Sequence, residues 1–263
     1  MKKVINSAIA AFAMFSRIPM PRCDWEKDNI RYMLVFMPLV GAVIGAVSYV
    51  WAFIGGRFWY DRILESMLLF LIPFVLTGGI HLDGFLDTTD ALSSWKSKEE
   101  RVEILKDVHV GAFAVIRGVV WLMFMFAVYT SVSKKEVLWP FLGLVFVMSR
   151  TLNALSILTF PKAKETGTVN TWQKDADPKC KGLLIAVFIV TAVAAILIHP
   201  LYGAILTVGV LAAFFWYYKK AMKYFGGMTG DLAGYFVCVC EAAVLFILAV
   251  VCAGLPVVQH LLK

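Results

Sequence analysis

Residues 66–90 read SMLLFLIPFVLTGGIHLDGFLDTTD, and this stretch decides how the rest of the chain is interpreted. An almost wholly apolar run leads directly into two glycines, a histidine and three aspartates. A membrane-spanning helix is apolar over about 20 residues, whereas ionisable groups at membrane depth are costly and usually serve a site. The stretch therefore predicts the end of a membrane span joined to the start of a functional site.

The whole chain is as apolar as this stretch. Of its 263 residues, 60% are hydrophobic and 16% are charged, against nearly half and about a quarter in a soluble domain. We therefore expect an all-α, polytopic transmembrane helix bundle that forms a single integral membrane domain over residues 1–263. The N-terminal segment reads as an amphipathic or half-inserted helix. Apolar runs predict about seven spans, near residues 33–54, 63–80, 111–132, 137–160, 182–198, 201–218 and 232–254.

The basic residues predict the orientation of these spans. With a cytoplasmic N-terminus, eighteen of the 25 lysines and arginines fall in cytoplasmic segments and five fall outside, as the positive-inside rule requires. The net charge of +7 is then explained by membrane topology, and no nucleic acid is expected as a partner. The same orientation places residues 78–90, 161–181 and 226–234 together at the cytoplasmic face.

Asp83, Asp87 and Asp90 are spaced i, i+4 and i+7, so they share one face of a helix. Acids at a helix N-terminus are also favoured by the helix dipole, which is the structural alternative. The apolar residues between the three aspartates favour a packed helix that directs its acids inward. Carboxylate oxygens suit Mg²⁺, Mn²⁺ or Ca²⁺, and Mg²⁺ often completes its shell with substrate phosphates. The spacing thus predicts a divalent metal site for phosphoryl transfer.

A second polar motif, GGMTGDLAG at residues 226–234, opens the last predicted span. We expect Asp231 to supply a fourth metal ligand beside Asp83, Asp87 and Asp90. A glycine-rich turn ahead of a helix N-terminus also suits phosphate, although a capping role for the threonine or aspartate is the structural alternative. The expected phosphate-contacting residues of this motif are Gly226, Gly227, Thr229 and Gly230.

Three further residues are candidates for contact with substrate phosphate: Arg17, Lys106 and Asp107. His81 is the most prominent histidine because it precedes Asp83 by two residues. Glu241 lies ten residues beyond Asp231 and either closes the site or pairs with Arg117 or Arg150.

Four stretches resemble the cobalamin synthase family, also called adenosylcobinamide-GDP ribazoletransferases. They are FSRIPMP (15–21), GGIHLDGFLDTTDAL (78–92), ERVEILKDVHVGAFAV (100–115) and YFGGMTGDLAGYFVCVCE (224–241). Their order and spacing agree with the family over most of the chain. The resemblance implies a Mg²⁺-dependent phosphotransferase that joins adenosylcobinamide-GDP to α-ribazole 5′-phosphate, or to α-ribazole. The products would be GMP and adenosylcobalamin 5′-phosphate, or adenosylcobalamin, at the last stage of nucleotide-loop assembly in cobalamin biosynthesis.

The resemblance also implies where the enzyme works and what its residues do. It points to the cytoplasmic (inner) membrane of a prokaryote, with the lipid bilayer as partner and a homo-oligomer as a possible state. The orientation that the basic residues favour puts the active site on the cytoplasmic face. On this hypothesis Asp83, Asp87 and Asp231 hold the metal. Asp90 either joins them or takes the proton of the attacking hydroxyl, with His81 as the second choice for that base.

Two other functions compete with this prediction. A CDP-alcohol phosphatidyltransferase also carries spaced aspartates at the ends of spans, but it has an Ala-Arg pair after its first Asp-Gly, which is missing after Asp83-Gly84. A cation-coupled transporter would place acids near the bilayer midplane on broken helices. Here the acids cluster at one predicted surface.

Overall fold

Helices form the regular structure of the protein in the computed structural model, which describes residues 2–23, 25–58, 61–107, 109–164 and 167–261. These residues contain no β-strand, only an isolated bridge between Lys162 and Met228. The predicted all-α class is therefore confirmed. The helices are α1 (Lys2–Phe15), α2 (Lys27–Ile30), η1 (Met33–Phe36), α3 (Met37–Phe58), α4 (Arg62–Thr77), α5 (Ile80–Ser93), α6 (Lys98–Ile104), α7 (Ala112–Ser133), η2 (Glu136–Leu138), α8 (Trp139–Thr159), α9 (Thr168–Asp175), α10 (Lys179–Ile198), α11 (Pro200–Phe225) and α12 (Gly230–Leu261).

Six segments among the described residues are long and apolar enough to cross a membrane: η1 with α3, α7, η2 with α8, α10, α11 and α12. A seventh is obtained if the bent pair α4 and α5 is counted as one span. The protein is thus a polytopic helical membrane protein, as its composition predicts. Which end of the bundle faces the cytoplasm stays a prediction from the basic residues.

Helix α8 is the most buried span and packs along α3. The two backbones approach closely at Gly45 and Gly143, where a Cβ added to Gly45 would lie 2.7 Å from the Gly143 Cα. Small residues permit such contact between helices in a membrane, where apolar side chains gain little by leaving lipid. In contrast, α7, α10 and α11 leave most of their surfaces exposed, as expected for helices that face lipid.

The second predicted span, residues 63–80, is not one straight helix. Helix α4 ends at Thr77, and the chain then turns by 90° into α5. Gly78 and Gly79 make this turn with φ values of +66° and +79°, a left-handed conformation that only glycine adopts without cost. With 16 residues, α4 is about 24 Å long at 1.5 Å per residue, which is shorter than the hydrocarbon core. The bend sets α5 at a right angle to α4.

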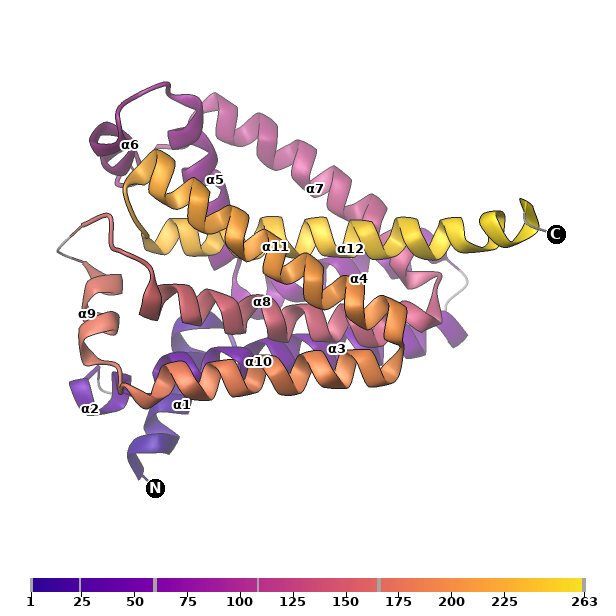
Figure 1. Cartoon of the computed structure of the whole chain (residues 1–263), viewed down its shortest axis with the longest axis horizontal. Coiled ribbons are helices and arrows are strands. Elements are labelled where there is room, and N and C mark those ends of the chain that lie inside the picture. Colours follow the sequence, from indigo (N-terminus) through magenta and orange to yellow (C-terminus); the bar gives the residue numbers. More distant parts are fainter. Residues whose placement is uncertain (1, 24, 59–60, 108, 165–166, 262–263) are drawn as a thin grey trace.

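The apolar run from 182 to 218 is divided as expected at His199 and Pro200. The His199 ring accepts a hydrogen bond from the Tyr202 amide at the start of α11. Helix α11 then continues to Phe225, beyond the predicted end at residue 218. Figure 1 shows that α6, α9 and the first turns of α12 lie at one end of the bundle, on the left, with the C-terminus at the other.

Candidate active site

Helix α5 carries the three aspartates of the HLDGFLDTTD motif, at the helical spacing that the sequence predicts. Asp83 is exposed, whereas Asp87 and Asp90 are half-buried. The Asp87 carboxylate lies within electrostatic range of Asp83, Asp90 and Asp231. The two acidic motifs are therefore neighbours in space, although Asp90 and Asp231 are 141 residues apart in the sequence.

Two glycines bring α5 against the start of α12. A Cβ added to Gly84 would lie 2.6 Å from the Asp231 carbonyl oxygen, and a Cβ added to Gly234 would lie 2.9 Å from the His81 carbonyl oxygen. Both distances are shorter than real side chains allow, so only glycine permits this approach. The contact places Asp83 of α5 and Asp231 of α12 in the wall of one cavity.

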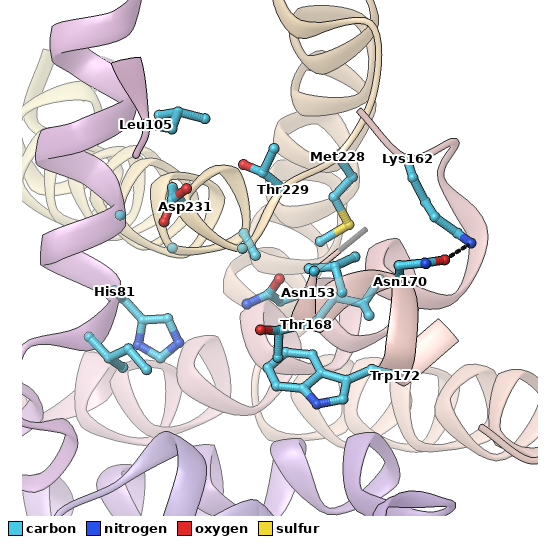
Figure 2. Close-up of a pocket in the computed structure, with 18 of the residues that line it drawn as sticks. His81, Leu105, Asn153, Lys162, Thr168, Asn170, Trp172, Met228, Thr229 and Asp231 are labelled. Atoms are coloured by element: carbon cyan, nitrogen blue, oxygen red, sulfur yellow. Dashed lines mark hydrogen bonds between the residues drawn. The ribbon is translucent and has the colours of Figure 1, made fainter. Parts of the chain in front are cut away.

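The cavity has a volume of about 560 Å³ and lies at the end of the bundle that holds α6 and α9. Residues of α1, α3, α5, α6, α8, α9 and α12 line it, from Met14 to Gly234, together with residues of the connecting segments. Figure 2 shows His81 and Asp231 on one side of it and Lys162 with Asn170 on the other. The polar residues in its wall are His81, Asp83, Lys106, Asn153, Lys162, Lys164, Thr168, Asn170, Thr229 and Asp231.

Three lysines face this cavity, of which the sequence singled out only Lys106. Lys162 donates a hydrogen bond of 2.5 Å to Asn170, and Lys164 donates one of 3.0 Å to the Val102 carbonyl. Burial lowers the pKa of the Lys164 ammonium, and neighbouring Lys106 lowers this pKa further. Acids from two helices and lysines from two loops thus line the same space.

The segment that carries Lys162 and Lys164 is held by the glycine-rich motif. The Met228 amide donates to the Pro161 carbonyl at 2.8 Å, and the Ala163 amide donates to the Met228 carbonyl at 3.1 Å. Gly227 fits beside this pairing, since an added Cβ would lie 2.3 Å from the Lys162 carbonyl carbon. Lys162 and Lys164, which in the sequence indicated only topology, therefore also line the site.

The rest of the glycine-rich motif has partly structural roles. Gly226 ends α11 in the left-handed conformation. The Thr229 hydroxyl accepts a hydrogen bond of 3.3 Å from the Leu232 amide, so it caps α12, which was the structural alternative for this residue. Thr229 and Gly230 nevertheless line the cavity, whereas Gly226 and Gly227 lie outside its wall.

Several other predicted site residues also lie outside the cavity wall. The Asp90 carboxylate lies against Gly111, where an added Cβ would be 2.1 Å away. The Arg17 side chain covers Gly78 at the α4–α5 bend. Asp107 pairs with His109 at 2.8 Å. Asp87 is close to the other acids but is not a lining residue.

Lys106 and His81 both line the cavity. The Lys106 ammonium is 2.7 Å from a carboxylate oxygen of Glu103. His81 is buried, with 8% of its surface exposed. Of the two residues expected to take a proton, His81 therefore lines the cavity and Asp90 does not.

Glu241 does not extend the site. Its carboxylate forms a buried ion pair with Arg150 at 2.5 Å and accepts a hydrogen bond of 2.7 Å from Ser149. Of the three roles open to Glu241 in the sequence, the structure thus selects pairing with Arg150. Cys238 and Cys240 are buried.

The donor set of the cavity fits one mode of metal binding. Among the described residues, no three histidine, cysteine, aspartate or glutamate side chains are arranged to hold a metal ion by themselves. Mg²⁺, however, is usually bound by one or two carboxylates together with substrate phosphates and water. Asp83 and Asp231 supply two carboxylates in one cavity that also contains lysines. They fit an ion that binds together with a phosphorylated substrate.

The fold and the cavity define a polytopic helical membrane protein with an acid- and lysine-lined site at one end of its bundle. The chain belongs to the cobalamin-5-phosphate synthase family, whose model matches residues 7–249. It is similar to proteins named adenosylcobinamide-GDP ribazoletransferase from three bacteria. Identity is 40% with the Lachnoclostridium phytofermentans protein (91% of each chain), 32% with a Clostridium botulinum protein (94% of this chain, 98% of the relative) and 31% with that of Alkaliphilus oremlandii (88% and 91%). No solved structure matches the chain.

Proposed function

We propose that this protein is an adenosylcobinamide-GDP ribazoletransferase that works at the membrane. It would join adenosylcobinamide-GDP to α-ribazole 5′-phosphate, or to α-ribazole, and release GMP. The observation that carries the proposal is one cavity in which Asp83 and Asp231 from separate helices meet Lys106, Lys162 and Lys164. The names of the family and of its relatives supply the substrates.

In the proposed reaction, a ribazole hydroxyl oxygen attacks the phosphorus that bears the cobinamide linker. A new P–O bond forms, the P–O bond to the GMP phosphate breaks, and the hydroxyl gives up its proton. Phosphoryl transfer depends mainly on positioning and on stabilisation of negative charge. The three lysines would bind the substrate phosphates and oppose the charge that develops on the leaving GMP.

Asp83 and Asp231 would hold Mg²⁺ in this cavity, with Asp87 as a nearby third carboxylate. The ion, when bound, neutralises pyrophosphate charge and stabilises the leaving oxygen. The protein's own contribution is to fix two carboxylates on helices that touch through Gly84, so their separation is set before substrate arrives.

His81 is the better placed of the two candidate bases. It lines the cavity, whereas the Asp90 carboxylate lies against Gly111 outside it. A base must be within hydrogen-bond reach of the proton that it accepts. We therefore assign proton acceptance to His81 and not to Asp90.

We place the cavity on the cytoplasmic face of a prokaryotic inner membrane. The support is the distribution of basic residues along the sequence, which favours that orientation. All the segments that line the cavity come from the predicted cytoplasmic parts of the chain or from adjoining span ends.

The test is a transfer assay on the full chain in liposomes. Adenosylcobinamide-GDP, α-ribazole 5′-phosphate and Mg²⁺ are supplied, and GMP is measured. We expect GMP release that requires both substrates and is abolished in Asp83→Ala, while the variant still inserts in the membrane. GMP release without the ribazole, or unchanged release by Asp83→Ala, would refute the proposal. Ion flux in the same liposomes without GMP release would favour a transporter.

A further inference from the structure

A second cavity lies at the same end of the bundle and shares no lining residue with the candidate active site. Its volume is about 380 Å³, and its wall is built from α5, α6, α7, α11 and α12 together with Trp95. We propose that it binds the phosphate headgroup of an anionic phospholipid. This inference does not depend on the proposed enzymatic activity.

Three cationic side chains line this cavity, Arg101, Arg117 and Lys220, and none of its lining residues is acidic. Arg101 has a buried Nε without a hydrogen-bond partner among the described residues. Arg117 has no hydrogen-bond or ion-pair partner in the part of the chain that the structure describes. Lys220 donates to the Tyr235 hydroxyl at 2.9 Å, a neutral partner. The positive charge of the cavity is therefore not balanced by the protein.

Arg117 and Lys220 come from different spans and are close enough to repel each other electrostatically. Two cations held together without an acid between them favour the binding of an anion. Guanidinium and ammonium groups both bind phosphate oxygens well, the guanidinium through paired N–H donors. A phosphate between Arg117 and Lys220 would accept from both and remove their repulsion.

The surroundings of the two cations point to a lipid rather than a soluble phosphate. On α7, Phe113, Ile116 and Val120 occupy the helix face that also carries Arg117, and all three are exposed. This is the apolar face of a span whose surface is mostly exposed. Arg117 lies five residues after the first residue of α7, Ala112, near the end of the span. Such a position places a cation at the level of lipid headgroups, with acyl chains alongside.

Helix α11, across the cavity from α7, also carries a cation beside an exposed apolar side chain. The Lys220 ammonium lies 4.5 Å from the centre of the Trp216 ring and 5.1 Å from that of Tyr235. Trp216 is itself exposed, and tryptophan is enriched where spans meet the headgroup layer. Basic pockets between spans are the known type of site for anionic headgroups. The cavity between α7 and α11 combines these features.

Occupancy of this cavity would also affect its neighbour. The short helix α6 supplies Arg101 to the lipid cavity and Val102 to the candidate active site. A headgroup that binds Arg101 would therefore fix a wall that the two cavities share.

The test measures lipid binding by the delipidated full chain in an uncharged detergent, by native mass spectrometry and by thermal unfolding. The probes are dioleoyl phosphatidylglycerol, dioleoyl phosphatidylcholine, inorganic phosphate and GDP. The variants are Arg117→Gln and Lys220→Gln. Lys219→Gln is the matched control because it removes the same charge from the adjacent exposed position, outside the cavity wall. Arg117→Lys keeps the charge and checks that folding is retained.

We expect phosphatidylglycerol to bind more tightly than phosphatidylcholine and to raise the unfolding temperature. Each glutamine variant in the cavity should weaken phosphatidylglycerol binding about fivefold, the effect of one basic residue near an anionic surface. Lys219→Gln and Arg117→Lys should bind it almost as the parent does. Equal binding by the double variant Arg117→Gln/Lys220→Gln, or equal loss in Lys219→Gln, would overturn the proposal. GDP or phosphate that displaces the lipid at these residues would assign the cavity to a soluble ligand instead.

Discussion

Gly84 of α5 lies directly on the backbone of Asp231 in α12. A Cβ at Gly84 would be 2.6 Å from the Asp231 carbonyl oxygen and 2.9 Å from its Cα, and Gly234 makes the reciprocal contact with His81. Both neighbours are backbone atoms, which cannot rotate away as a side chain does. The separation of the two helices, and with it the placement of Asp83 beside Asp231, is thus set by the absence of a methyl group.

Gly84→Ala is expected to reduce both the transfer rate and the stability of the protein. The added methyl group forces α5 away from α12, and a misplacement of about 1 Å can cost about 100-fold in rate. Overpacking of this kind costs about 1–3 kcal/mol of stability. The measurements are GMP release and thermal unfolding. Gly182→Ala is the control, because nothing lies within 4 Å of its added Cβ. An unchanged rate in Gly84→Ala would mean that the helix separation does not set the site.

Asp83→Asn and Asp231→Asn are each expected to lower the transfer rate by about 100-fold or more and to raise the Mg²⁺ concentration needed for half-maximal rate. Each removes one carboxylate charge without changing the size of the side chain. Because the two acids line one cavity, the double variant should be little worse than either single variant. Asp61→Asn is the control, since Asp61 caps α4 far from the cavity by accepting from the Ile63 and Leu64 amides and asparagine caps equally well. Fully additive losses would show that the acids act separately.

The affinity for adenosylcobinamide-GDP is expected to fall at alkaline pH through Lys164. Burial lowers the pKa of this lysine, so as pH rises it loses its proton before an exposed lysine, whose pKa is about 10.4. The KM for the GDP substrate should therefore rise on the alkaline side. In Lys164→Arg the positive charge persists to higher pH, so the rise in KM should also occur at higher pH. Lys174→Arg, at an exposed position outside the cavity wall, should leave the dependence of KM on pH unchanged. If Lys164→Arg also left it unchanged, Lys164 would not be the group that causes the rise in KM.

The buried ion pair of Arg150 and Glu241 is expected to matter for stability. Glu241→Gln leaves the Arg150 charge buried, with only 2% of that side chain exposed, and removal of one partner of a buried pair costs about 3–5 kcal/mol. The paired change Arg150→Met/Glu241→Met removes both charges and should recover more than half of this loss. Unfolding in mixed micelles with increasing denaturing detergent measures both. If the double variant were no more stable than Glu241→Gln, the unpaired Arg150 charge would not be the cause of the stability loss.

The helical spans and the two polar motifs were predictable because each depends on residues near one another in the sequence. The i, i+4, i+7 spacing of the aspartates indicated α5, and the break between the predicted spans 182–198 and 201–218 indicated the turn between α10 and α11. The bend at Gly78 and Gly79 was harder, since a glycine pair after an apolar run reads as the end of a span. The structure shows that this pair, with positive φ at both residues, turns the chain by 90° into another helix.

Two of the three lysines of the site were not predictable in the same way. Lys162 and Lys164 reach the cavity because their segment pairs with the backbone of Met228, a contact between residues that have no local pattern in common. The partner of Glu241 was likewise left open between Arg117 and Arg150, since both are arginines within apolar runs. Packing decided the choice: Arg150 is buried beside Glu241, and Arg117 is exposed on α7.

The dependence of the cavity on both α5 and α12 determines when it forms during synthesis. Helix α5 leaves the ribosome with its aspartates long before Asp231, which belongs to the last of the candidate spans. Until α12 has entered the membrane and packed its glycines against α5, the nascent chain holds half of a site and none of the cavity. Chains that lack α12 are therefore expected to have no transfer activity, because the proposed site needs Asp231.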